Sequence, residues 1–356
     1  MKKVAIVGIQ GVPAKYGGFE SLVENIIGDN CSPDIQYTVF CSGKDYKTHL
    51  KSYKGARLKY ISAFRANGIQ SVPYDILSMI KCVRGYDDIV ILGVSGCIFL
   101  PILRLLYHKR LIINIDGLEH KRDKWGKMAK KFLRFSEAMA VRYANVVIAD
   151  NKGIQDYVKE TYKKDSSLVA YGGDHAQRNL SEEQQIQLIS KYGIVAGNYA
   201  VSLCRIEPEN NSNLICDAFS ESGKVLVFVG NWNHNEYGRS LKKKYESYRN
   251  IKMIDAVYDL DELYALRNQC SCYIHGHSAG GTNPSLVEAM FFGKPILTYD
   301  VVYNRETTEN KAYYFKSKEQ LIELLHRKNK NGDNMREIAE RRYVWKLVAK
   351  QYEALY

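Results

Sequence analysis

The sequence predicts an α/β protein made of two Rossmann-like domains. Short runs rich in β-branched residues alternate with helical patterns from residue 3 to residue 150, and the same rhythm returns from residue 198 onward. Strands that alternate with helices form parallel sheets, because each helix carries the chain back to the same edge of the sheet. The length of 356 residues also suits two domains, since single hydrophobic cores rarely grow beyond roughly 250 to 300 residues.

Each domain is expected to hold one parallel sheet with crossover helices. In the first series the expected strands are KVAIVGI (3–9), QYTVFCS (36–42), RLKYISA (57–63), DIVILGV (88–94), RLIINID (110–116) and ANVVIAD (144–150). In the second series they are NYAVSLC (198–204), KVLVFVGN (224–231), NIKMIDA (250–256), CYIHG (272–276) and KPILTYD (294–300). Helical patterns separate them, including a long basic helix after residue 120.

The domain boundary is expected between Tyr171 and Asn198. A short helix in this stretch, SEEQQIQLISKYG, has Ser181 as its predicted cap and Gly193 as its predicted stop. We therefore expect an N-terminal domain at residues 1–173 and a C-terminal domain at 174–339, with a final helix at about 340–356 returning to the first domain. Ligands of open α/β sheets collect at the carboxyl ends of the strands, so the sequence predicts a site in the cleft between the two domains.

The composition is that of a globular protein with an anionic partner. The chain is 25% charged and 46% hydrophobic, with a net charge of +12 that favours nucleic acid, a membrane surface or a phosphorylated substrate. Its longest apolar run, residues 89–103, is interrupted by glycines and a proline and is shorter than the roughly 20 residues that a bilayer requires. The N-terminal apolar run lacks a cleavage site and reads as the first strand, which predicts a cytoplasmic protein.

The eight cysteines are scattered through apolar segments. They form no CxxC pair and no disulfide-like framework. We interpret them as reduced core residues.

A glycine loop follows the first strand. In VGIQGVPAKYGGFESLVENI, Gly8 and Gly11 permit a turn, while Gly17 and Gly18 precede a helix. The dinucleotide fingerprint GxGxxG is absent, and the second strand ends without the acidic residue that binds a ribose. The pattern disfavours a dinucleotide oxidoreductase and leaves a plain tight turn as the alternative to a ligand-binding loop.

The most informative segment is CSCYIHGHSAGGTNPSLVEAMFF, residues 270–292. Asn283 is suited to cap a helix whose first residue is Pro284, which places the loop Gly280, Gly281 and Thr282 beside free backbone N–H groups. Glu288 then lies about one turn into the helix, where its carboxylate can accept bonds from two sugar hydroxyls. The segment therefore predicts a binding site for phosphate and hydroxyl groups.

Several motifs together resemble glycosyltransferase family 4, whose members have the GT-B fold. These motifs are PxxxGGFE (residues 13–20), LCRIEPENN (203–211) and HSAGGTNPSLVEAMFFGKPIL (277–297). Three further motifs, NIDGLEHKRDKW (114–125), GNWNHNEYG (230–238) and YDVVYNRE (299–306), resemble a bacterial group of rhamnosyltransferases that build capsule and cell-wall polysaccharides. The resemblance extends over nearly the whole chain.

The resemblance implies a nucleotide-sugar donor, most simply dTDP-rhamnose, and neither a metal nor a cofactor. Gly17 and Gly18 would approach the donor diphosphate, together with Arg205 and the loop from Gly280 to Asn283, while Glu288 would bind the ribose. The leaving diphosphate develops negative charge, which preorganised donors must stabilise. An arginine suits this task because its guanidinium stays charged and offers a fork of N–H groups, although a surface or interdomain ion pair is the alternative for Arg205.

The sequence departs from the wider family at two places. The usual pair of glutamates eight residues apart survives only as Glu288, with Gly280 in the position of the first. Because the first carboxylate commonly supports the transferred sugar, its absence suggests a donor with fewer hydroxyls, such as a 6-deoxy sugar. The lysine expected after the arginine is also missing, and Asn210 and Asn211 stand near its place.

Asp116, at the carboxyl end of its predicted strand, is the candidate catalytic carboxylate. By resemblance it faces the acceptor hydroxyl, accepting its proton or orienting it, although an Asp-Gly pair is also a common turn. Enzymes of family 4 retain the anomeric configuration of the donor sugar. Such an enzyme needs no dedicated strong base, because the departing phosphate can take the proton of the acceptor hydroxyl. The acceptor-binding candidates that follow are Glu119, His120, Lys121, Arg122 and Trp125, with His120 replacing the tryptophan expected in this group.

Residues 121–142 carry eight Lys or Arg side chains among aromatic and apolar residues at helical spacing. This pattern fits an interfacial helix on an anionic membrane as well as a solvated helix packed by one face. The resemblance favours the membrane, because the acceptors of these enzymes are saccharides on polyprenyl diphosphate. No pattern typical of nucleic-acid binding is present.

The possible metal ligands have simpler explanations. The DxD at Asp259–Asp261 reads as a helix cap followed by Glu262 in the first turn. His275 reads as a strand end and His277 as a contact for donor sugar or phosphate, because no third ligand cluster lies nearby.

Four alternatives stay open. The donor could be another nucleotide sugar of glucose, galactose or N-acetylglucosamine. The protein could be a nucleotide-sugar epimerase on the same fold. It could also be a non-catalytic module that binds a membrane surface, or one that binds nucleic acid.

Overall fold

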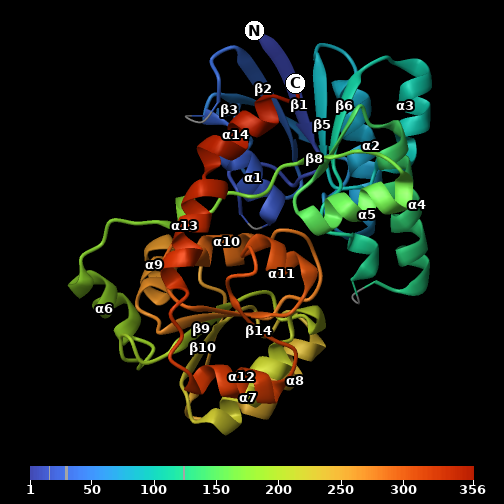
Figure 1. Cartoon of the computed structure of the whole chain (residues 1–356). Coiled ribbons are helices and arrows are strands. Elements are labelled where there is room, and N and C mark those ends of the chain that lie inside the picture. Colours follow the sequence, from blue (N-terminus) through green and yellow to red (C-terminus); the bar gives the residue numbers. More distant parts are fainter. Residues whose placement is uncertain (16, 29–30, 123–124) are drawn as a thin grey trace. The chain divides into compact units, whose positions relative to one another are not determined.

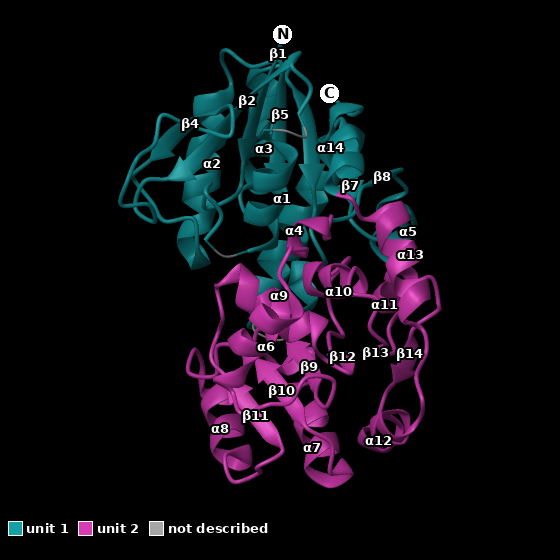
Figure 2. Ribbon diagram, turned by 90° about the vertical axis from the view of Figure 1, so that its left-hand side faces the viewer, with its two compact units in different colours: residues 1–171, 345–356 teal, residues 172–344 magenta. Residues whose placement is uncertain are grey.

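The computed structural model divides into two compact units, coloured separately in Figure 2. Unit 1 comprises residues 1–171 and 345–356, and unit 2 comprises residues 172–344. The structure describes residues 1–15, 17–28, 31–122 and 125–356. Each unit is an α/β structure around its own sheet (Figure 1).

Unit 1 contains an eight-stranded sheet in the order β3-β4-β2-β1-β5-β6-β7-β8. All its neighbours pair in parallel except the hairpin of β3 and β4 at one edge. The strands are β1 (Lys2–Val7), β2 (Ile35–Ser42), β3 (Ser52–Tyr53), β4 (Ala56–Ile61), β5 (Asp88–Leu92), β6 (Arg110–Asn114), β7 (Val146–Ala149) and β8 (Ser167–Leu168).

The helices of unit 1 cover its sheet. They are α1 (Gly18–Ile26), α2 (Ser71–Cys82), α3 (Leu100–Leu106), α4 (Lys127–Tyr143), α5 (Lys152–Tyr162) and α14 (Trp345–Glu353), with 3-10 turns η2 (Gly68–Gln70), η3 (Cys97–Phe99) and η4 (Glu119–Lys121). Helix α14, from the end of the chain, packs beside α1 in one hydrophobic cluster with β1 and β2 (Figure 1). Tyr352 of α14 also accepts a bond of 2.9 Å from the side chain of Asn114, at the carboxyl end of β6.

Unit 2 contains a six-stranded parallel sheet in the order β11-β10-β9-β12-β13-β14. The strands are β9 (Ala200–Leu203), β10 (Leu226–Val229), β11 (Ile251–Ile254), β12 (Cys272–His275), β13 (Ile296–Tyr299) and β14 (Tyr313–Phe315). The helices are α6 (Glu182–Ser190), α7 (Ser212–Ser222), α8 (Glu236–Tyr245), α9 (Leu260–Asn268), α10 (Pro284–Met290), α11 (Val302–Thr307), α12 (Lys318–His326) and α13 (Gly332–Arg342), with η5 (Asp174–Ala176) and η6 (Pro208–Asn210).

The helix caps follow the predicted side-chain chemistry. Ser181 and Gln184 form a reciprocal capping box at α6, which ends at Ser190, three residues before Gly193. Asp259 caps α9 by accepting the N–H groups of Asp261 and Glu262, which confirms the cap interpretation of the DxD sequence. Such caps satisfy backbone N–H groups that have no partner within the helix.

The basic helix is shorter than the pattern of residues 121–142 indicates. Helix α4 begins at Lys127 after Gly126, and residues 119–121 form a separate 3-10 turn. Trp125, which belongs to the aromatic residues of the predicted helical pattern, therefore precedes the helix. Residues 123–124 of the predicted segment lie outside the described residues. Within the described ranges, every helix is too short or too polar to span a bilayer.

Candidate functional site

Arg205 follows β9 and has an exposed side chain. Its guanidinium makes no ion pair with any residue that the structure describes in unit 2. The backbone carbonyl of Arg205 accepts a 2.7 Å bond from the side chain of Asn210, which is buried. The loop is thus fixed through its backbone, while the charged group stays available for an anion.

The loop after β12 is hydrogen-bonded to the segment that carries Arg205. The side chain of Asn211 donates to the Gly276 carbonyl at 2.8 Å, and Ser278 donates to the Glu209 carbonyl through both its N–H and its hydroxyl, at 2.9 and 2.8 Å. A Cβ on Gly276 would lie 2.2 Å from a backbone oxygen, so only glycine fits there. The structure brings these two predicted donor-binding segments together.

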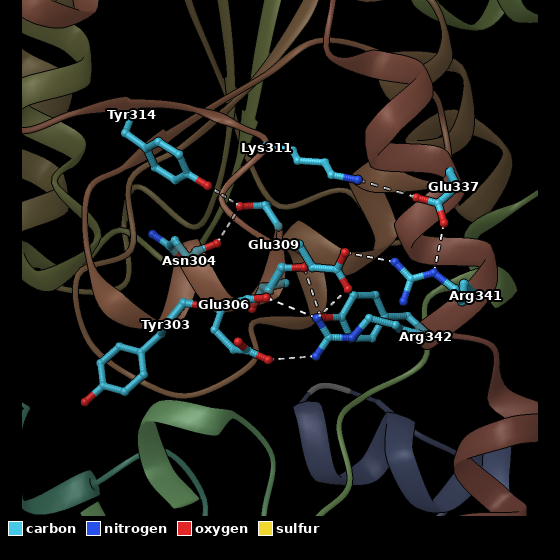
Figure 3. Close-up of polar contacts among 12 residues, drawn as sticks. Tyr303, Asn304, Glu306, Glu309, Lys311, Tyr314, Glu337, Arg341 and Arg342 are labelled. Carbon is cyan, nitrogen blue, oxygen red and sulfur yellow. Dashed lines mark hydrogen bonds and ion pairs between the residues drawn. The ribbon is translucent and has the colours of Figure 1, made fainter. Parts of the chain in front are cut away.

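Asn304 holds the loop from its other side. This side chain is 2% exposed and donates to the carbonyls of His277 and Tyr299, both at 2.9 Å. It belongs to the YDVVYNRE motif and lies on α11 (Figure 3). The motif is visible in the sequence, but the role of its asparagine depends on contacts that only the structure shows.

Helix α11 and the turn that follows it are in turn fixed to α13 by ion pairs (Figure 3). Arg342 contacts Glu306 at 2.8 Å and Glu309 at 3.1 Å, and Arg341 contacts Glu309 at 2.8 Å. These pairs are partly exposed, so each contributes little alone. Their common effect is to keep α11, and with it Asn304, in one place.

The double-glycine loop leads into α10 as the sequence predicts. Asn283 caps the helix by accepting the Ser285 N–H at 3.1 Å, and Pro284 is the first helical residue. Gly280 has a φ of +116°, and a Cβ there would meet no atom within 4 Å. Gly281 is half-buried and Thr282 is buried. Because α10 has only seven residues, its dipole is weak, and anion binding would depend mainly on Arg205 and the loop N–H groups.

Glu288 is held by two residues that the sequence analysis did not single out. Its carboxylate pairs with Arg267 of α9, which is 6% exposed, and Nε2 of His175 lies 3.4 Å from its other oxygen. Burial alone would raise the pKa of Glu288, but Arg267 and His175 outweigh it and lower that pKa. Glu288 therefore offers a fixed, ionised carboxylate with part of its bonding capacity already used.

His275 and His277 are stacked, with ring centroids 4.3 Å apart and an interplanar angle of 9°. His275 ends β12 as predicted and is 1% exposed. Burial lowers the pKa of His275 to about 3, so this ring is neutral at physiological pH. His275 thus supports the ring of His277, the predicted donor contact.

In unit 1, Gly17 is the N-cap of α1 and Gly18 its first residue. Gly17 has a φ of +126°, and a Cβ there would lie 2.0 Å from Oε2 of Glu20. The Glu20 carboxylate accepts the Gln10 N–H at 2.9 Å and so connects the helix to the glycine loop after β1. Burial is the main reason that the pKa of Glu20 is raised, and the negative charge of Asp116 adds to it.

Replacing Gly17 by alanine is expected to lower the free energy of unfolding by about 1–3 kcal/mol, the usual cost of a non-glycine residue in such backbone. Displacement of Glu20 should add to this loss. The matched control is Gly55→Ala, at a φ of +80° with no atom within 4 Å of the added Cβ. Urea unfolding of both variants checks the prediction, and an equal loss in both would contradict a role for the Glu20 contact.

Asp116 follows β6 and is half-buried. Its φ is +60°, and Leu118 has a φ of +52°. The N–H of Asp116 donates to the side chain of Asn114 at 3.0 Å. Non-glycine residues in left-handed backbone are uncommon, and they concentrate where a structure holds functional groups in place.

The predicted acceptor-binding residues contact one another and the body of unit 1. Glu119 pairs with Arg122 at 2.8 Å and accepts the Trp125 indole N–H at 2.9 Å. Lys121 lies over the ring of Tyr157, with its Nζ 4.9 Å from the centroid.

His120 contacts the buried carboxylate of Glu137 at 3.0 Å. The other oxygen of Glu137 accepts the hydroxyls of Tyr157 and Tyr162, both at 2.8 Å. These contacts fix the segment to the body of unit 1. Among the residues that the structure describes, His, Cys, Asp and Glu form no group of three or more that could hold a metal ion.

Comparisons with known proteins agree with this architecture. Residues 185–344 match the family described as glycosyl transferases group 1, and residues 1–174 match a domain of unknown function, DUF1972. No curated protein matches the chain.

Three solved structures illustrate the similarity of fold. Sucrose-phosphate synthase from Thermosynechococcus elongatus is 15% identical, with a TM-score of 0.84 over 100% of this chain and 98% of the other. Anabaena HepE in complex with UDP-glucose is 16% identical, with a TM-score of 0.77 over 100% and 99%. The catalytic domain of starch synthase IV from Arabidopsis thaliana, bound to ADP and acarbose, is 13% identical, with a TM-score of 0.71 over 99% and 97%.

The two parallel-sheet units thus have the fold of GT-B glycosyltransferases. The match of residues 185–344 to the group 1 glycosyl transferases supports glycosyltransferase activity.

Proposed function

We propose that the protein is a retaining glycosyltransferase that moves L-rhamnose from dTDP-rhamnose onto a saccharide linked to polyprenyl diphosphate. The product would enter cell-wall or capsule polysaccharide, and the enzyme would work at the inner face of the cell membrane. The observation that carries the proposal is the arrangement in unit 2. An exposed arginine without an ion-pair partner among the described residues lies on a segment bonded to a glycine loop, and a fixed carboxylate follows that loop.

The donor would be held by charge and by backbone groups. Arg205 and the N–H groups of residues 280–283 would bind the diphosphate, with Gly17 and Gly18 as further contacts. His277 would touch the sugar or a phosphate oxygen, and Glu288 would accept ribose hydroxyls. HepE binds UDP-glucose in the same fold, which supports a nucleotide-sugar donor here.

The reaction would proceed on one face of the sugar. The bond between the anomeric carbon and the diphosphate oxygen breaks, the acceptor hydroxyl oxygen bonds to that carbon, and the hydroxyl proton passes to the departing phosphate. Arg205 would stabilise the charge that develops on the diphosphate. Asp116 would orient the acceptor hydroxyl, and the segment with Glu119, His120, Lys121, Arg122 and Trp125 would contact the acceptor.

Gly280 supports a 6-deoxy donor. It stands where the wider family carries a carboxylate, and the space beside it is open. A site without that carboxylate loses one partner for a sugar hydroxyl, and rhamnose has one hydroxyl fewer than a hexose such as glucose. The same observation would also fit another nucleotide sugar with fewer hydroxyl groups to bind, which the donor panel below distinguishes.

The test is transfer by the purified protein to a polyprenyl diphosphate-linked saccharide, with a panel of nucleotide sugars that includes dTDP-rhamnose and UDP-glucose. We expect product from dTDP-rhamnose only when acceptor is present. Bound dTDP-rhamnose should also raise the unfolding temperature of the protein, because a ligand at 100 times its Kd stabilises the folded state by about 2.7 kcal/mol. An altered sugar without acceptor would indicate an epimerase, and transfer from UDP-glucose alone would replace the proposed donor. Salt-sensitive binding to lipid or DNA without any stabilisation by nucleotides would indicate a non-catalytic module.

A further inference from the structure

Unit 1 exposes large apolar side chains along η3 and α3. Ile98, Ile102, Leu105 and Leu106 are all exposed, and Leu105 is 81% exposed. Their spacing places them on one side of the helix, opposite the buried Leu100 and Leu103. Scattered exposed apolar residues are normal in proteins, but a contiguous group of this size usually marks an interaction surface.

Helix α4 extends this apolar surface. The Ile98 N–H donates to the Ser136 hydroxyl at 3.1 Å, and Arg104 donates to the Tyr143 carbonyl at 2.9 Å, so α3 lies along the second half of α4 (Figure 1). On α4, Met128 is 80% exposed, and Phe135, seven residues later and hence on the same side of the helix, is also exposed.

The surroundings of these apolar residues are basic. Lys127, Lys131, Arg134 and Arg142 of α4 are exposed. The only acidic residue of α4 is Glu137, which is 1% exposed and bonded to His120, Tyr157 and Tyr162. Helix α3 contains no acidic residue. Apolar side chains bordered by cations that have no acidic partner among the described residues of α3 and α4 complement a bilayer with anionic headgroups.

We propose that this surface docks on an anionic lipid bilayer. We define the α3–α4 face as two sets of residues. The apolar set is Ile98, Ile102, Leu105, Leu106, Met128 and Phe135, and the basic set is Lys127, Lys131, Arg134 and Arg142. The apolar set enters the boundary between headgroups and acyl chains, with α3 as its principal element, and the basic set contacts the headgroups. The proposal rests on the proposed function, because a lipid-linked acceptor requires the enzyme to reach a membrane, and it identifies the surface that does so.

A lipid surface fits the α3–α4 face better than a macromolecule does. Protein–protein interfaces are depleted of lysine relative to the rest of the surface, whereas Lys127 and Lys131 lie on α4 within about one turn of Met128 and Phe135. A nucleic acid would be bound by the cations, but it would leave Leu105 and Leu106 in water. An anionic bilayer satisfies both sets at once.

Co-sedimentation of the full chain with vesicles tests the proposal. One set of vesicles contains phosphatidylglycerol and phosphatidylcholine, and the other contains phosphatidylcholine alone. We expect binding to the anionic vesicles that weakens in high salt, and about 100-fold weaker binding by the double variant Leu105→Glu/Leu106→Glu. Lys131→Glu/Arg134→Glu should weaken binding without affecting the apolar set. Ile186→Glu is the matched control, because Ile186 is an exposed apolar residue of α6 in unit 2.

Three results would overturn the proposal. The first is unchanged vesicle binding by both double variants, and the second is equal binding of the wild type to neutral and anionic vesicles. The third is a wild type that forms a dimer and binds no vesicles, together with a leucine variant that is monomeric. Thermal unfolding of each variant shows that the fold is retained. Transfer to a short-chain, water-soluble prenyl diphosphate acceptor separates the two proposals. The Leu105→Glu/Leu106→Glu variant should retain transfer to this soluble acceptor. If the wild type shows no such transfer, the proposed function is contradicted, and vesicle binding alone then tests the docking surface.

Discussion

Replacing Arg205 by alanine is expected to lower kcat/KM for sugar transfer about 10²–10³-fold, as removal of one preorganised donor from a developing oxyanion usually does. The side chain is exposed and makes no ion pair with a described residue. Its loss should therefore leave the fold and the unfolding temperature of the free protein nearly unchanged. Steady-state kinetics with dTDP-rhamnose, or with whichever donor the panel selects, measures the effect.

Two further variants make this result specific. Arg205→Lys keeps the charge but loses the two-pronged geometry, so its activity should lie between those of the wild type and the alanine variant. Arg239→Ala removes another exposed arginine of unit 2, whose guanidinium donates to the backbone carbonyl of Asn233, and should act like the wild type. Full activity of Arg205→Ala would exclude this residue from stabilising the leaving group.

Periodicity and cap chemistry were sufficient to predict the fold. The strands with clear β-branched runs were found, because a buried parallel strand is apolar on both faces and leaves a continuous signal. The strands β3, β8 and β14 were missed, since two or three residues are too few to show a pattern. The start of α4 was placed too early because its basic composition continues upstream of Gly126, where the helix actually begins.

The site was predictable only where a local motif carried the information. Asn283 and Pro284 form the expected helix start, since caps depend on neighbouring residues in the chain. Arg267, His175 and Asn304 were not singled out as site residues, because each acts through a contact with a distant segment. Arg267 lies 21 residues from Glu288, and Asn304 lies 27 residues from His277. Asn304 could have been suspected from its motif, whereas no local pattern distinguishes Arg267 from any other arginine on a helix.

Replacing Arg267 by methionine is expected to lower the free energy of unfolding at neutral pH by about 3–5 kcal/mol, because it leaves the Glu288 carboxylate largely buried without its main counter-charge. The second change Glu288→Gln in the same chain should restore part of the loss, since it removes the uncompensated charge. Urea unfolding of the wild type, both single variants and the double variant forms the double-mutant cycle that measures the coupling. Transfer should fall as well, because Glu288 would no longer be fixed in place.

The pH dependence gives an independent check of this ion pair. The pKa of Glu288 is lowered in the folded protein. The pair therefore stabilises the fold above the carboxyl's unfolded pKa of about 4.3, and the contribution is lost as the pH falls through the lower, folded pKa. In Arg267→Met, burial then dominates and raises the pKa of Glu288, so this carboxyl becomes neutral at a higher pH than in the wild type. The stability difference between wild type and variant should be largest near pH 7 and shrink toward the acid range. A difference that stays constant across this range would show that Arg267 stabilises the protein through packing instead of through the charge of Glu288.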